Sequence, residues 1–208
     1  MVRAWIADVT PLLDKECYDR YYSRVPDFRR KKADALRMDK MKAQSIGVWI
    51  LWQKVRAAYE LPENASFNLS HSGTYVMFAA CTDGGRVRVG CDIEQKGSMK
   101  MNFVRRHFCR EEYDTIEAAE TEDEQTDLFF RYWVLKESFM KATGKGMALP
   151  VNSFCIRMGR PPVLIRQPAE FSEPYYYCEY GIEGLPYKMA VCSSDADIDT
   201  ELHTELTL

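Results

Sequence analysis

Two acidic residues stand two positions apart at the end of a strand-like segment, residues 86–94. Side chains two apart on a strand face the same side, so Asp92 and Glu94 project together. Two carboxylates held this close repel each other unless a cation lies between them, and Mg²⁺ is a hard cation that prefers oxygen ligands. The pair therefore predicts a divalent metal site, although two solvated acids at an exposed strand end would have the same pattern.

A second group lies on the helix predicted over residues 127–143. Positions 133, 137, 141 and 144 share one helix face, and they carry an aromatic ring, a carboxylate, an ammonium and a glycine. Glu137 and Lys141 alone are also an ordinary surface ion pair, worth about 0.3 kcal/mol. Lys145 stands between two glycines, and this favours chemistry, because backbone without side chains can approach a phosphate closely.

A third group, Asn68 to Gly73, ends another strand with polar residues and a glycine. His71 is one of three histidines in the chain, and its ring can donate a hydrogen bond to an anion. A solvated loop histidine is the alternative.

Hydrophobic periodicity predicts the elements that must position these groups. We expect a strand over 3–9, helices over 11–20 and from 26 to about 60, strands over 66–70, 74–81 and 86–94, helices from 109 and over 127–143, and strands over 153–158, 163–165, 175–180 and 187–192. Thr82 to Gly85 predicts a hairpin turn between two of these strands, because its glycines accept positive φ. The order predicts an α+β chain of two similar α+β halves, 1–98 and 99–208. Asp92 and Glu94 would end the first half and Glu137 and Lys141 would come from the second, with the site at the seam.

Composition restricts the class of protein. The chain has 208 residues, 46% of them hydrophobic, and a net charge of −3, which is typical of a folded protein and gives no basic excess for nucleic acid. No apolar run approaches the roughly 20 residues of a membrane span. The seven cysteines are scattered without a Cys-x-x-Cys pair, so the sequence suggests neither disulfides nor zinc and favours a cytoplasmic protein.

Together the three groups resemble the motifs of one enzyme family. Asn68–Ser72, Gly90–Glu94 and Trp133–Met147 are similar in order and spacing to the signature of the larger monomeric 4′-phosphopantetheinyl transferases, the surfactin-synthetase-activating type. The resemblance extends over most of the chain. It implies a pseudo-twofold fold of two subdomains and transfer of the 4′-phosphopantetheine arm of coenzyme A to a serine of an apo acyl or peptidyl carrier protein, releasing 3′,5′-ADP.

The resemblance also implies roles for individual residues. Asp92, Glu94 and Glu137 would bind Mg²⁺, with Mn²⁺ as an alternative, and Glu137 would also accept the serine proton. Lys141 would face the phosphate that leaves, and Lys136 would contact the pyrophosphate. Coenzyme A would be held further by the residues Lys31, Ser70 and His71.

Two departures from the family pattern concern the coenzyme. Phe28 stands where a second basic residue is expected, and the segment 59–67 is short. Lys40, Lys42 or Gln44 would then supply substitute contacts.

The carrier protein implied by the resemblance is small and acidic, and the apolar and basic segment 99–108 fits such a partner. A connector between the halves with buried Phe103 and Phe108 is the alternative for this segment. We expect a monomer. A catalytically inactive module that binds coenzyme A or a carrier protein is the alternative function, and the absence of P-loop and Gly-x-Gly-x-x-Gly motifs disfavours other phosphotransferases.

Overall fold

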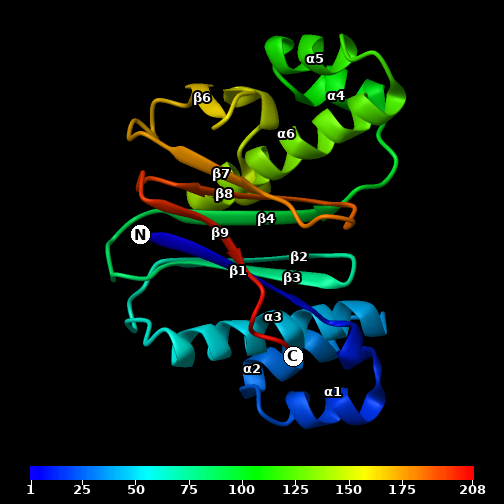
Figure 1. Ribbon diagram of the computed structural model, residues 1–208, viewed down its shortest axis with the longest axis vertical. Coiled ribbons are helices and arrows are strands. Elements are labelled where there is room, and N and C mark those ends of the chain that lie inside the picture. The colour runs from blue at the N-terminus through cyan, green and yellow to red at the C-terminus, as the bar shows by residue number, and fades with distance from the viewer.

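The computed structural model describes residues 1–208 and has four layers, in which two stacked sheets are enclosed by helices on both sides (Figure 1). The first part of the chain contains β1 (Val2–Asp8), η1 (Thr10–Leu13), α1 (Lys15–Tyr22), α2 (Asp27–Asp34), α3 (Asp39–Ala58), β2 (Phe67–Ser72) and β3 (Tyr75–Cys81). The second contains β4 (Val89–Gln95), α4 (Met101–His107), α5 (Arg110–Glu117), α6 (Glu122–Ala142), η2 (Gly146–Ala148), η3 (Val151–Ser153), β5 (Cys155–Arg157), β6 (Val163–Arg166), β7 (Tyr176–Tyr180), β8 (Tyr187–Ser193) and β9 (Ile198–His203). The predicted α+β class is confirmed.

The same arrangement of a strand, a long helix and two antiparallel strands occurs twice. One sheet has the order β2-β3-β1-β9 and the other β4-β8-β7, so β1, β3 and β2 correspond to β4, β8 and β7. All these pairs are antiparallel. In this repeat the second unit begins with β4, before the predicted boundary at 98/99. The last strand, β9, returns to the first sheet and pairs with β1 in parallel.

The predicted hairpin at Thr82–Gly85 is wrong for the same reason. β3 pairs with β1 and β2, whereas β4 pairs with β8, so this segment carries the chain from one sheet to the other. The hairpin lies instead between β2 and β3, where Gly73 has a φ of 58°. Turn chemistry marks where a chain reverses, but it does not determine which strands become hydrogen-bonded partners.

Strand alternation fills three apolar cores. On β1, Trp5 and Ala7 face the helix layer, whereas Ala4 and Ile6 face the second sheet. Both faces of each sheet are therefore buried over much of their area, and β1 and β3 are almost continuously apolar for that reason. No helix is sufficiently long and apolar to cross a membrane.

The helix α6 packs very closely on β4 at Gly90. A Cβ atom at this position would lie 2.0 Å from the carbonyl oxygen of Ser138 and 2.4 Å from the backbone nitrogen of Ala142. Backbone atoms cannot move aside as a flexible side chain can, so only glycine fits. This contact brings the last turns of α6 beside the acidic end of β4.

We predict that Gly90→Ala lowers the free energy of unfolding by roughly 3 kcal/mol or more, because the added methyl must push α6 away from β4. Gly97→Ala is the matched control, since nothing lies within 4 Å of a Cβ there. Urea unfolding measures both variants. Equal stability of the two would contradict the close contact at Gly90.

Candidate active site

The two sheets meet at the free edges of β2 and β4, and side chains of β2 bond to the backbone of β4. Three side-chain oxygens, two residues apart on β2, accept hydrogen bonds from three backbone N–H groups, two residues apart on β4. The bonds join Cys91 N–H to Asn68 Oδ1 at 3.2 Å, Ile93 N–H to Ser70 Oγ at 3.4 Å, and Gln95 N–H to Ser72 Oγ at 3.1 Å. Polar side chains thus replace the backbone ladder that would otherwise join two strands.

This seam organises a partly buried ion pair. The Lys141 ammonium of α6 donates to Asp92 Oδ1 at 2.7 Å and to Ser70 Oγ at 2.9 Å, and the Ser70 hydroxyl donates to the same Asp92 oxygen at 2.8 Å. Asp92 is only 2% exposed. Ser70 of β2, Asp92 of β4 and Lys141 of α6 therefore meet at one point. Each of them belongs to a different one of the three sequence motifs.

Two further carboxylates share this environment. The Ser72 hydroxyl donates to Glu94 Oε2 at 2.7 Å. Burial raises the pKa of Glu94 and of Glu137, and the nearby charge of Asp92 raises both pKa values further. Burial also raises the pKa of Asp92, against the opposing effect of Lys141. The three acids repel one another, and one ammonium group compensates them only in part.

The donor set fits a hard cation. Asp92 Oδ2 is buried and has no hydrogen-bond partner, and an unpaired buried carboxylate oxygen is costly. Oxygen ligands of this kind are those that Mg²⁺ prefers, and Mg²⁺ usually keeps waters and substrate phosphates in its remaining positions. The oxygens of Asp92, Glu94 and Glu137 do not all lie within 4.8 Å of one another, so the structure does not gather these three predicted ligands into a closed set.

A cationic pocket lies on the other side of β2. Strand alternation turns Ser70 and Ser72 to the seam and His71 to a cavity of about 170 Å³, which is also lined by Arg29, Lys32 and Ser45. The apolar part of the lining consists of Leu36, Met41, Val48 and Leu69.

No acidic residue lines this pocket. Arg29 is buried with its guanidinium 4.5 Å from the Trp49 ring centre, and its Nε has no hydrogen-bond partner. Desolvation lowers the pKa of His71, and the charges of Lys141, Lys32 and Arg29 lower this pKa further. Cations gathered without a counter-charge indicate an anion site.

The structure places Lys31 outside this pocket. Its ammonium pairs with Asp27 at 3.0 Å and its side chain is 76% exposed. Residues 29 and 32 are three apart on α2 and both line the pocket, with Arg29 buried and Lys32 exposed, whereas Lys31 does not line it. Arg29 and Lys32 are therefore the cations that line the pocket. Helical periodicity within the basic run Arg29–Lys32 was the signal for them.

The suggested substitutes for coenzyme contacts also lie elsewhere. Lys42 pairs with Asp39 at 3.7 Å, and Lys40 is exposed. The Gln44 side chain donates to the Gly73 carbonyl at 2.9 Å, which supports the β2–β3 turn. None of the three lines the cationic pocket.

The prediction that Lys136 contacts a pyrophosphate is wrong. Its side chain is fully buried, pairs with the equally buried Glu112 at 2.9 Å, and donates to the carbonyls of Val151 and Phe154 at 2.8 and 3.0 Å. All three donors of the ammonium are occupied inside the apolar core packed around α6, which we call the second core. Lys136 faces away from the seam because it is one residue before Glu137, about 100° around the helix.

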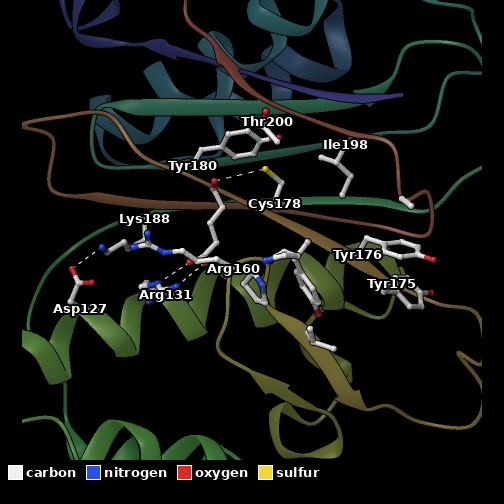
Figure 2. Close-up of a pocket in the computed structure, with 16 residues that line it drawn as sticks. Asp127, Arg131, Arg160, Tyr175, Tyr176, Cys178, Tyr180, Lys188, Ile198 and Thr200 are labelled. Atoms are coloured by element: carbon white, nitrogen blue, oxygen red, sulfur yellow. Dashed lines mark hydrogen bonds and ion pairs between the residues drawn. The ribbon is translucent and has the colours of Figure 1, made fainter.

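A hollow of about 860 Å³ lies elsewhere, beside β7, β8 and β9 (Figure 2). Four of its five charged side chains are already paired, since Arg131 bonds both oxygens of Glu179 and Lys188 contacts Asp127 at 2.7 Å. It contains none of the site residues predicted from the sequence.

Comparison with known proteins agrees with the motifs, the repeated topology and the seam. Residues 88–192 match the model of the 4′-phosphopantetheinyl transferase superfamily, and the chain belongs to this family, as the resemblance predicted. The 4′-phosphopantetheinyl transferase Sfp of Bacillus subtilis is 35% identical over 143 residues, which cover 69% of this chain and 61% of that protein.

Two further relatives cover less of the chain. The 4′-phosphopantetheinyl transferase gsp of Aneurinibacillus migulanus is 33% identical over 61% of this chain and 51% of its own length. The mouse L-aminoadipate-semialdehyde dehydrogenase-phosphopantetheinyl transferase is 41% identical over 43% of this chain and 30% of its own. The match thus spans less than two thirds of the length of these curated relatives.

The repulsion among the acids makes a prediction for the metal-free protein. We expect Glu94→Gln and Glu137→Gln each to increase its stability by about 1 kcal/mol in EDTA, since each removes one like charge. Raised folded-state pKa values mean that the folded protein binds protons more tightly than the unfolded chain. The stability of the parent protein should therefore fall as pH rises from about 4.3 through the raised pKa values, and less so in the variants.

Urea midpoints measured between about pH 4.5 and pH 7 test this prediction. Glu183→Gln, at an exposed site, is the control and should change neither the midpoint nor its pH dependence. Destabilisation by both site variants in EDTA would show that the two carboxylates do not repel each other.

Proposed function

We propose that the protein transfers the 4′-phosphopantetheine group of coenzyme A to a serine of an apo acyl or peptidyl carrier protein, with Mg²⁺, and releases 3′,5′-ADP. One observation carries the proposal. β2 is a shared wall, with the Ser70–Asp92–Lys141 cluster on one side and the cationic His71 pocket on the other. Coenzyme A carries a pyrophosphate and a separate 3′-phosphate, and these two anionic groups suit two neighbouring sites of this kind.

The residues divide the chemistry among them. Asp92, Glu94 and Glu137 would hold Mg²⁺, which supplies charge neutralisation to the pyrophosphate when it is bound. The serine oxygen forms a bond to the β-phosphorus, and the bond from this phosphorus to the bridging oxygen of the α-phosphate breaks. Lys141 also donates to the Cys91 carbonyl at 3.2 Å, and it would exchange one of its three hydrogen bonds to stabilise the charge that grows on the leaving phosphate.

The serine proton needs an acceptor near the seam. Glu137 is the candidate, because burial and the charge of Asp92 raise the pKa of its carboxylate, which makes it a better base than an ordinary glutamate. Its place one helical turn before Lys141 puts the base and the cation on one face of α6.

The helix α4 suits the carrier protein. Phe103 is 36% exposed, Arg105 and Arg106 are exposed beside it, and together they present an apolar and basic surface to an acidic partner. Phe108, by contrast, is buried in the second core, as the connector alternative required for that residue.

We predict that the protein, mixed with coenzyme A, Mg²⁺ and an apo carrier protein, adds one phosphopantetheine mass to the carrier. Asp92→Asn should reduce the rate about 100-fold or more, since it removes the anionic partner of Lys141 and a metal ligand. Mass spectrometry of the intact carrier measures the transfer, and a thermal scan verifies that the variant is folded.

Two outcomes would contradict this proposal. A mass gain that survives Asp92→Asn would reject the metal site. No gain with parent protein that binds coenzyme A and the carrier normally would favour the inactive binding module.

The cationic pocket makes a separate prediction about the coenzyme. Lys32→Ala should weaken binding of coenzyme A about 10-fold by loss of a charge-assisted contact, with little effect on 3′-dephospho-coenzyme A. Lys31→Ala is the adjacent matched control and should bind both ligands as the parent does. Calorimetry measures the four affinities, and a larger loss for Lys31→Ala than for Lys32→Ala would reject the pocket as the 3′-phosphate site.

A further inference from the structure

Two of the scattered cysteines meet in the second unit. Cys109 precedes the first turn of α5, Cys155 begins β5, and both are buried, at 4% and 0% exposure. Their sulfur atoms and a carboxylate oxygen of Glu111 all lie within 4.8 Å of one another. The sequence suggested no metal site, because these cysteines are far apart along the chain and belong to no Cys-x-x-Cys motif.

The thiols have only weak hydrogen-bond partners. The Cys109 thiol donates to the Phe154 carbonyl at 3.4 Å, and the Cys155 thiol donates to Glu111 Oε2 at 3.7 Å. Burial raises the pKa of both thiols, so they keep their protons at neutral pH when no metal is bound. Little hydrogen bonding would be lost if a metal ion took the place of these protons.

We propose that Cys109, Cys155 and Glu111 form a binding site for a thiophilic divalent ion of the Zn²⁺ class, separate from the acidic seam. Two sulfur donors and one carboxylate are a ligand set for Zn²⁺ and not for Mg²⁺. On binding, both thiols release their protons to solvent and form metal–sulfur bonds. The exposed side of Glu111 leaves a fourth position to water.

The dimensions and the surroundings suit this ion. A tetrahedral zinc site has sulfur ligands about 3.8 Å apart, so the three side chains need to close by about 1 Å or less. Glu111 is also 3.6 Å from Arg166, which offsets the extra negative charge. Two thiolates and one carboxylate around a divalent ion leave one such charge.

The position of the site gives it a structural consequence. The Cys109 N–H donates to Glu112 at 3.2 Å, and so does the Ile156 N–H at 2.8 Å. Glu112 is the partner of Lys136, which directly precedes Glu137 on α6. The ion would therefore tie α5 to β5 beside the buried pair that supports the catalytic helix.

A second group, Cys81 with Asp83 and Asp195, has similarly short separations but carries no such inference. Its carboxylates already contact the ammonium of Met1, at 2.7 and 3.8 Å. It also offers only one sulfur.

The test is a titration with Co²⁺, which substitutes for Zn²⁺ and gives near-ultraviolet absorption only when thiolates bind it. The full chain is used with a phosphine reductant and excess Mg²⁺ to occupy the seam. We expect one equivalent of Co²⁺ to produce the thiolate band and Zn²⁺ to displace it. The apparent affinity should fall about 100-fold per pH unit on acidification, since two protons are released.

Three variants make the assignment specific. Cys109→Ser and Cys155→Ser should each weaken Co²⁺ binding about 100-fold, and serine at 109 keeps the helix capped. Cys178→Ser is the control and should bind Co²⁺ as the parent does. Zn²⁺ should raise the unfolding temperature of the parent and of Cys178→Ser only.

Several results would overturn the proposal. One is the absence of a thiolate band in reduced, folded parent protein. Another is a band that persists when both Cys109 and Cys155 are replaced by serine. Zinc-dependent stabilisation that survives in that double variant would equally reject the site. All these readouts are independent of phosphopantetheine transfer, so failure of one proposal leaves the other unaffected.

Discussion

The contact between the free edges of β2 and β4 is the constraint on which the rest of the site depends. Two edge strands of different sheets do not share a backbone ladder here, and β2 instead offers Asn68, Ser70 and Ser72 to the exposed N–H groups of β4. An unpaired N–H group in this position would cost about 1–3 kcal/mol. The alternation of polar residues on β2 therefore fixes the register between the two units, and with it the distance of Asp92 from Ser70.

Ser70 joins this structural role to the chemistry. Its hydroxyl accepts from the Ile93 N–H and from Lys141, and it donates to Asp92, which uses the one donor and both acceptor positions of a hydroxyl. Gly90 completes the arrangement, because it allows α6 to approach β4 so closely that Lys141 reaches the carboxylate. The unpaired Asp92 oxygen and the repelling glutamates remain as a local cost, and a cation would remove that cost.

Much of this organisation could be predicted from the sequence. The α+β class, the long helix bearing Glu137 and Lys141, and the strands bearing Ser70 and Asp92 all follow from local periodicity. The family resemblance, which the superfamily match at residues 88–192 confirmed, linked the three motifs. Helical spacing separates Lys136 from Glu137 by about 100°, but the sequence could not show that the buried Glu112 lies beside Lys136.

The sequence by itself determined which side chains share a face, because the periods of strands and helices are properties of the local backbone. The tertiary structure alone decided which faces meet. It paired β4 with β8 instead of β3, placed Arg29 and Lys32 along one pocket and Lys31 outside it, and brought Cys109 to Cys155. These outcomes depend on packing between segments far apart in the chain, where burial of apolar area and satisfaction of polar groups are decided jointly, and no local pattern records that balance.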